Sequence, residues 1–167
     1  DIRKFGFIKI YNYSLITKSK HLAHLGPEPL EKNWNCFYLK KYFIGRKRSI
    51  KNILMDQKCV SGLGNIYVNE ILFRSGIQPT RMVNKLKNFE IEKIIKFSKK
   101  ILKNSIKFGG STIKDFSSEN GKKGVFQQHF KVYGKENQKC SNIDCNLRIV
   151  RTVISNRASF LCKKCQK

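Results

Sequence analysis

Acidic residues are scarce in this chain, and long apolar runs are missing. Only 11 Asp and Glu stand against 35 Lys and Arg among 167 residues, which gives a formal net charge of +24. Such an excess is costly to keep compact without an anionic partner, so DNA or RNA is the first partner expected. No apolar run reaches the roughly eighteen residues of a membrane span, and no signal-peptide core follows the N-terminus. We therefore expect a cytoplasmic protein with no membrane partner.

A local catalytic constellation is also missing. His21, His24 and His129 are scattered, and no Ser or Cys nucleophile has an evident basic partner. The few carboxylates show no paired arrangement, so the residues by themselves assign no enzyme. The chain starts at Asp1 without an initiator Met, and apolar and basic positions alternate from Lys4 onward, which indicates a strand entered in mid-fold. We expect further residues before Asp1.

Cysteines are present in a specific pattern near the end of the chain. Cys140 and Cys145 form a C-x4-C pair, Cys162 and Cys165 form a C-x2-C pair, and sixteen residues separate the pairs. Two such pairs around a short hairpin can surround one tetrahedral zinc ion and leave no open position for catalysis. The pattern favours one structural Zn²⁺, with two disulfides or chance cysteines as the alternatives.

The middle of the chain predicts helices. Ser49 can cap a helix that ends near Cys59, a second opens after the glycine-bracketed turn at residues 62–65, and a third runs from about Asn88 to Phe108. Prolines within residues 25–30 mark a connector between domains.

Two further segments follow the third helix. Residues 117–124 are polar and contain glycines, which predicts a mobile loop of the kind that closes over ligands. Residues 125–133 are predicted to form a strand.

Several residues are candidates for holding phosphates. Asn65 begins a helix after a Gly-x-Gly turn, where free backbone amides and the helix dipole favour an anion, although such a turn is more often plain punctuation. Lys51 could add a charge to the same side, or be an ordinary surface lysine. Arg157 lies where the cysteine hairpin should turn and could clamp a phosphate, or be one more exposed arginine. Arg3 and Phe5 share a strand face and could enter a duplex together, although Phe5 is otherwise simply core.

The segments together resemble the formamidopyrimidine-DNA glycosylases, bacterial enzymes that remove oxidised purines from DNA. The resemblance covers nearly the whole chain in order and approximate spacing, through residues 1–6, 25–30, 54–57, 62–67, 109–112, 133–134 and 157–167. It implies an α+β protein with three parts. Residues 1–24 are the last strands of an N-terminal β-sandwich, 25–134 a helix-two-turn-helix domain with a lesion-capping loop, and 135–167 a zinc-ribbon β-hairpin.

The resemblance also assigns roles to these residues. Lys51 and Asn65 are expected to bind phosphates around a lesion, and Arg157 to hold the phosphates of the flipped nucleotide and so assist catalysis. Arg3 is expected to face the cytosine left behind and Phe5 to wedge the stack. Lys4 and Lys114 complete the DNA-binding set. The resemblance also implies a monomer that acts on double-stranded DNA containing an oxidised purine or an abasic site.

Two features depart from the family pattern. The first cysteine pair is usually C-x2-C in the family, and the family's nucleophile, an N-terminal proline amine followed by a glutamate, is not among these 167 residues. The chain by itself is therefore expected to be inactive as a glycosylase and abasic-site lyase. The alternatives are an endonuclease VIII-type glycosylase for oxidised pyrimidines, or a non-catalytic zinc-dependent DNA-binding module.

Overall fold

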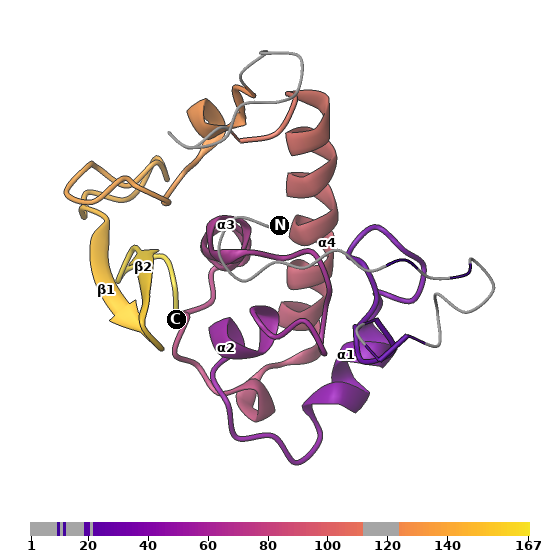
Figure 1. Cartoon of the computed structure of the whole chain (residues 1–167). Coiled ribbons are helices and arrows are strands. Elements are labelled where there is room, and N and C mark those ends of the chain that lie inside the picture. The colour runs from indigo at the N-terminus through magenta and orange to yellow at the C-terminus, as the bar shows by residue number, and fades with distance from the viewer. Residues whose placement is uncertain (1–9, 11, 13–18, 21, 112–123) are drawn as a thin grey trace.

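The computed structural model describes residues 10, 12, 19, 20, 22–111 and 124–167 of the chain. Helices come first in these residues and a two-stranded hairpin comes last (Figure 1). The elements are α1 (Cys36–Phe43), α2 (Ile50–Leu54), α3 (Asn65–Ser75), the short 3₁₀ helix η2 (Val83–Lys85), α4 (Asn88–Lys107), the 3₁₀ helix η3 (Phe126–His129), β1 (Val150–Ile154) and β2 (Arg157–Leu161). No helix in the described ranges is both long and apolar enough to cross a membrane.

The first two helices are short and begin at polar caps. The Asn35 side chain accepts a hydrogen bond from the Tyr38 amide at 2.9 Å and starts α1, which the sequence pattern did not predict. The Ser49 side chain caps α2 as predicted. However, α2 ends at Leu54 and not near Cys59, because the chain turns at Asp56, whose carbonyl accepts from the Cys59 amide at 2.8 Å.

The two longer helices agree with the sequence pattern. Gly64 precedes α3, and Gly76 ends it in the left-handed region at φ +73°, which costs glycine little. The helix α4 spans Asn88–Lys107 and ends before two glycines, close to the predicted bounds. Its face towards α3 and α1 is buried, so α4 forms the back of the helical domain.

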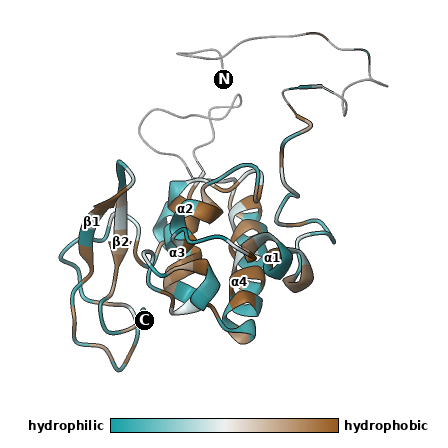
Figure 2. Ribbon diagram, turned by 90° about the horizontal axis from the view of Figure 1, so that it is seen from below, coloured by the Kyte–Doolittle hydropathy of each residue, from teal (hydrophilic) through white to brown (hydrophobic). Residues whose placement is uncertain are grey.

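One hydrophobic core holds the helices together, with Trp34 at its centre. The Trp34 side chain is fully buried, and its indole N–H donates to Ser98 Oγ on α4 at 2.8 Å. The helix α3 packs against α4 on one side and against β2 on the other. The hairpin and α4 accordingly lie on opposite sides of α3 (Figure 2).

The segment after α4 is not a strand, so that prediction for residues 125–133 is wrong. Residues Phe126–His129 form η3, and the following amides of Lys131, Val132 and Tyr133 all donate to the buried Glu70 carboxylate at 2.8–3.0 Å. Because Glu70 lies on α3, some sixty residues earlier, a side chain takes the place of the neighbouring strand that the pattern implied.

The cysteine-bearing end of the chain forms an antiparallel hairpin. Val150 pairs with Leu161 and Ile154 with Arg157, so the turn contains only two residues. These are Ser155 and Asn156, at φ +48° and +59°, which are the signs required by the type I′ turn that suits a two-residue hairpin. The described cysteines form no disulfide.

Candidate metal site and phosphate-binding surface

The four cysteines of the predicted zinc pattern come together around the base of the hairpin. All four sulfur atoms lie within 4.8 Å of one another. The distance from Cys140 Sγ to Cys165 Sγ is 3.8 Å, and that from Cys145 Sγ to Cys162 Sγ is 3.5 Å. Four thiolates at about 2.3 Å from a tetrahedral ion are about 3.8 Å apart, so the set fits one metal ion. Neither disulfide pairing nor chance spacing accounts for this geometry.

The second cysteine pair is tied directly to the end of α3. The buried Gln166 side chain accepts from the Cys162 amide at 3.0 Å and donates to the Ile77 carbonyl at 2.9 Å. Backbone bonds from Gln78 to Lys167 and from Lys167 to Gly76 run beside it. The base of the hairpin therefore has a fixed position on the helical domain.

The strand β2 is tied to the first half of α3. Asn69 Oδ1 accepts from the Phe160 amide at 2.8 Å, and Asn65 Nδ2 donates to the Ala158 carbonyl at 3.0 Å. Asn69 in turn donates to the Asn65 carbonyl at 2.7 Å. Two asparagines one helical turn apart thus hold β2 against the N-terminus of α3.

Lys51 is buried between α2 and the hairpin and is not a surface lysine. Its ammonium donates to the Ala158 carbonyl at 2.9 Å and to the Ser159 hydroxyl. Burial lowers the pKa of Lys51 to about 8, and the nearby Arg157 guanidinium acts in the same direction. Both hydrogen-bond partners of this ammonium are neutral oxygens, and among the described residues no carboxylate forms an ion pair with it.

Arg157 follows the hairpin turn and is exposed. It lines a cavity of about 240 Å³ together with Arg48, Lys51, Asn52, Met55, Ile154 and Ser155. In the described part of the chain only Arg48 among these cations has an acidic partner, Asp56 at 2.8 Å. Three cations around one small cavity, two of them without a counter-charge, are an arrangement whose charge suits an anion.

The start of α3 adds backbone donors beside this cavity. The first amide N–H groups of a helix have no intrahelical acceptor, and Gly64 has no side chain that could cap them. The Lys51 and Asn65 side chains therefore meet at the Ala158 carbonyl, and Arg157 is the residue before Ala158 in β2. Arg3, Lys4, Phe5 and Lys114 lie outside the described residues, as does most of the predicted capping loop.

Three residues of this arrangement were not found from the sequence. Arg48 belongs to a basic run that resembles an ordinary solvated face, while Asn69 and Glu70 are polar positions inside a helix. The partners of Asn69 and Glu70 lie far along the chain, at Phe160 and Val132, whereas Arg48 pairs with the nearby Asp56. Asn69 and Glu70 could have been found from the sequence, because they are two adjacent polar residues among the apolar positions of a predicted helix.

A glycine-hinged helix pair, a long back helix and a hairpin clasped by four thiols define a helix-two-turn-helix protein with a cysteine ribbon. The family described as "Formamidopyrimidine-DNA glycosylase H2TH domain" matches residues 25–117, which is more than half of the chain. The chain belongs to the formamidopyrimidine-DNA glycosylase family.

Individual relatives agree with this assignment. The chain is 40% identical over 167 residues to the formamidopyrimidine-DNA glycosylase of Ruegeria sp. (strain TM1040), covering 100% of this chain and 59% of that protein. A complex between the Lactococcus lactis Fpg and DNA containing an abasic site has a TM-score of 0.90 at 31% identity and covers 100% of this chain and 60% of that chain. A variant of the Lactococcus protein bound to DNA containing Fapy-dG gives the same values. The chain thus spans about three fifths of the length of these relatives.

Proposed function

We propose that this chain is the phosphate-gripping part of a DNA glycosylase and abasic-site lyase that removes oxidised purines, such as 8-oxoguanine and formamidopyrimidines, in base-excision repair. The observation that carries the proposal is that Lys51 and Asn65 both bind the Ala158 carbonyl, while Lys51 and Arg157 line the same small cavity. The activity named for the relatives, and the lesions in the DNA of the two complexes, indicate the chemistry.

The proposed task of the surface is to hold a distorted backbone. A base inside a duplex cannot be reached by an enzyme, so the nucleotide must be flipped out at a cost of a few kcal/mol. Lys51 and Arg157 would neutralise the phosphates on either side of the flipped nucleotide, and the free amides of α3 would bind a third oxygen. Arg3 would face the cytosine left in the opposite DNA strand, and Phe5 would wedge the base stack beside it. Lys4 and Lys114 complete the proposed set of DNA-binding residues.

One structural zinc ion is the proposed occupant of the four thiols. The thiol set of Cys140, Cys145, Cys162 and Cys165 is soft, tetrahedral in spacing and without an open position, which suits Zn²⁺ in a structural role. An ion bound there would fix the hairpin and so the position of Arg157. We also propose that the protein acts as a monomer in the bacterial cytoplasm, where the free thiols of Cys36 and Cys59 are stable.

Lesion selectivity tests the proposed function. The chain is expected to bind a duplex with a tetrahydrofuran abasic analogue at least about fivefold more tightly than the same undamaged duplex, because the gap lowers the cost of flipping. Fluorescence anisotropy at fixed salt measures both dissociation constants. Equal affinities would support the non-catalytic binding module instead. A preference for thymine glycol over 8-oxoguanine duplexes would support the endonuclease VIII type.

The affinity for DNA is expected to fall as the pH rises through about 8. Only the charged form of Lys51 attracts phosphate, and its pKa in the free protein is about 8. A bound phosphate favours the ammonium, so binding takes up a proton and weakens as that proton becomes harder to supply. Anisotropy between about pH 6.5 and 9 at constant ionic strength measures this.

Two variants test whether the pH dependence of DNA affinity comes from Lys51 or from other lysines. Lys51→Met should bind more weakly at neutral pH and lose the step near pH 8, whereas the exposed control Lys58→Met should keep the step. If Lys51→Met keeps the same pH profile as the unmodified chain, Lys51 is not a phosphate ligand.

A further inference from the structure

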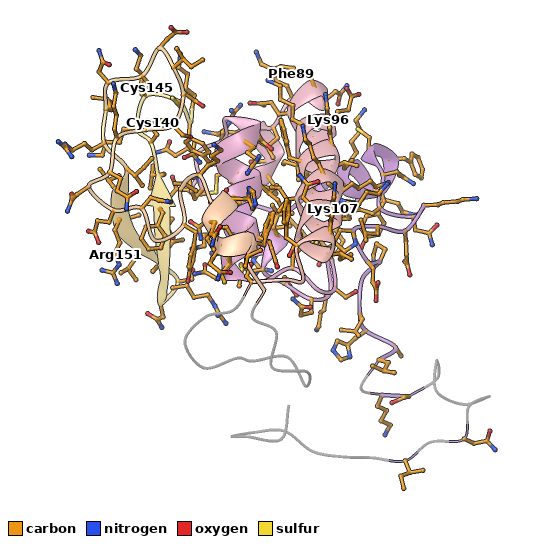
Figure 3. The ribbon with its side chains drawn as sticks, turned by 90° about the horizontal axis from the view of Figure 1, so that it is seen from above. Phe89, Lys96, Lys107, Cys140, Cys145 and Arg151 are labelled. Carbon is orange, nitrogen blue, oxygen red and sulfur yellow. The ribbon has the colours of Figure 1, made fainter. Side chains whose placement is uncertain are left out.

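The outer face of α4 carries an uninterrupted row of lysines that the proposed site does not use. At 100° per residue, these lysines lie opposite the buried Ile91, Ile94 and Ile101 of the same helix. All members of the row are exposed, and they recur at intervals of three and four residues: Lys93, Lys96, Lys100, Lys103 and Lys107. Figure 3 shows Phe89, Lys96 and Lys107 spaced along this helix.

Within the described ranges of the chain no lysine of this row forms an ion pair, and the acidic residue on the exposed face of α4 is Glu92, four positions before Lys96. The ion pairs there involve Arg48, Arg74 and Arg81, and no lysine of α4. Lys93 contacts only an aromatic ring, with its Nζ 5.3 Å from the Phe89 centroid. Five lysines against one glutamate along about 21 Å of rigid helix produce a strong local positive potential.

The row faces away from the proposed phosphate site. The helix α3 carries that site at its N-terminus and packs against the buried face of α4, so the lysines project from the opposite side of α4. The hairpin and α4 lie on either side of α3 in all three views (Figures 1 to 3). A straight duplex held by Lys51, Asn65 and Arg157 therefore does not reach the row.

We propose that the α4 lysine row, defined by these five residues, is a second DNA-binding surface that holds the backbone of another duplex segment. Lysine is a flexible point charge that binds phosphate oxygens without reading sequence, and the spacing along a helix suits a regular line of phosphates. A duplex fits better than a single strand, because Phe89 is the only exposed aromatic ring of α4, Phe97 being packed against the core, and single strands need stacking platforms.

A membrane surface fits the row less well. Amphipathic helices bind membranes by inserting an apolar face, and the apolar face of α4 is enclosed in the protein core. With one duplex in the lesion site and a second on α4, the protein can bridge two segments and pass between them during a search. The proposal goes beyond the proposed function and depends on it only for the identity of the polyanion.

A two-duplex capture assay tests this surface. Beads carrying a duplex with the abasic analogue are saturated with the 167-residue chain, washed, and offered a fluorescent undamaged duplex at low salt. The unmodified chain is expected to capture the second duplex. Changing all five lysines of the row to Gln should leave loading within about twofold, because the first site is untouched, and should lower capture at least about fivefold, since several phosphate contacts are lost.

The matched control changes five other exposed lysines to Gln, namely Lys20, Lys32, Lys41, Lys58 and Lys85, which removes the same charge without removing the row. This control should keep most of the capture. No capture by the unmodified chain, or an equal loss in the control, would overturn the proposal, as would capture of phosphatidylserine vesicles in place of duplex. Loading without preference for the abasic analogue would instead contradict the proposed function, so the two failures are distinguishable.

Discussion

Replacing Cys162 with serine is expected to abolish metal binding and to weaken DNA binding by more than about 100-fold. Structural zinc contributes roughly 10–16 kcal/mol of apparent binding free energy in small domains. The other interactions of the hairpin cannot make up for the loss of that stabilisation. The second, smaller core contains three of the four cysteines, together with Phe73, Val132, Ile149 and Phe160. Without an ion this core loses its centre, and Arg157 loses its position.

The change is measured as metal content and as affinity on the same samples. A chromogenic chelator should release about one zinc per unmodified chain and almost none from Cys162→Ser. Far-UV circular dichroism should change little, because the helical core around Trp34 is separate from the cysteine cluster. The control is Cys36→Ser, which lies on α1 outside the cluster and should keep both metal and affinity. Normal DNA binding by metal-free Cys162→Ser would disprove the structural role of the ion.

Glu70→Gln is expected to lower the free energy of unfolding by about 2–4 kcal/mol. The carboxylate accepts hydrogen bonds from three successive amides and is 1% exposed. A glutamine turns one acceptor oxygen into a donor that faces those N–H groups, which leaves buried donors unsatisfied. The same segment carries Phe130 and Tyr133, whose rings connect the helical core to Phe160 of the hairpin.

Urea unfolding followed by circular dichroism measures this loss. The matched control is Glu92→Gln, the same chemical change at an exposed position of α4, which should stay within about 0.5 kcal/mol of the unmodified chain. If both variants unfold at the same urea concentration, Glu70 does not hold the segment after η3.

The parts of the fold that the sequence predicted are those with local signals. The apolar spacing of α4, the glycine at each end of α3 and the cysteine spacing all act within a few residues, and the structure agrees with them. The helix α1 escaped prediction because its aromatic residues do not follow one face. Phe37 is 78% exposed, while Leu39 and Phe43 are buried.

The parts that the sequence could not predict depend on distant partners. The segment at residues 125–133 has apolar residues typical of a strand, but its amides bind Glu70. The sequence could not show that Lys51 is buried, because its hydrogen-bond partner Ala158, on β2, lies 107 positions later in the chain. The domain boundaries and the DNA contacts of Arg3, Lys4, Phe5, Lys51, Asn65, Lys114 and Arg157 stay predictions.

The salt dependence of DNA binding by Arg157→Ala tests the central claim most directly. The claim is that two parts of the protein jointly bind the phosphates of DNA: the metal-binding hairpin and the turn between α2 and α3. Arg157 is the cation where these two parts meet. Arg151→Ala is the control, because Arg151 is also exposed on the hairpin (Figure 3). It lines a different cavity from Arg157. Dissociation constants for one abasic-analogue duplex are measured at several salt concentrations.

For Arg157→Ala we expect an affinity loss of about 10-fold or more and a log–log salt slope shallower by about 0.9, the value for one lost phosphate contact. For Arg151→Ala we expect an unchanged slope and an affinity within about twofold of the unmodified chain. If the two variants show the same slope and the same affinity, Arg157 does not hold a phosphate and the shared surface is contradicted.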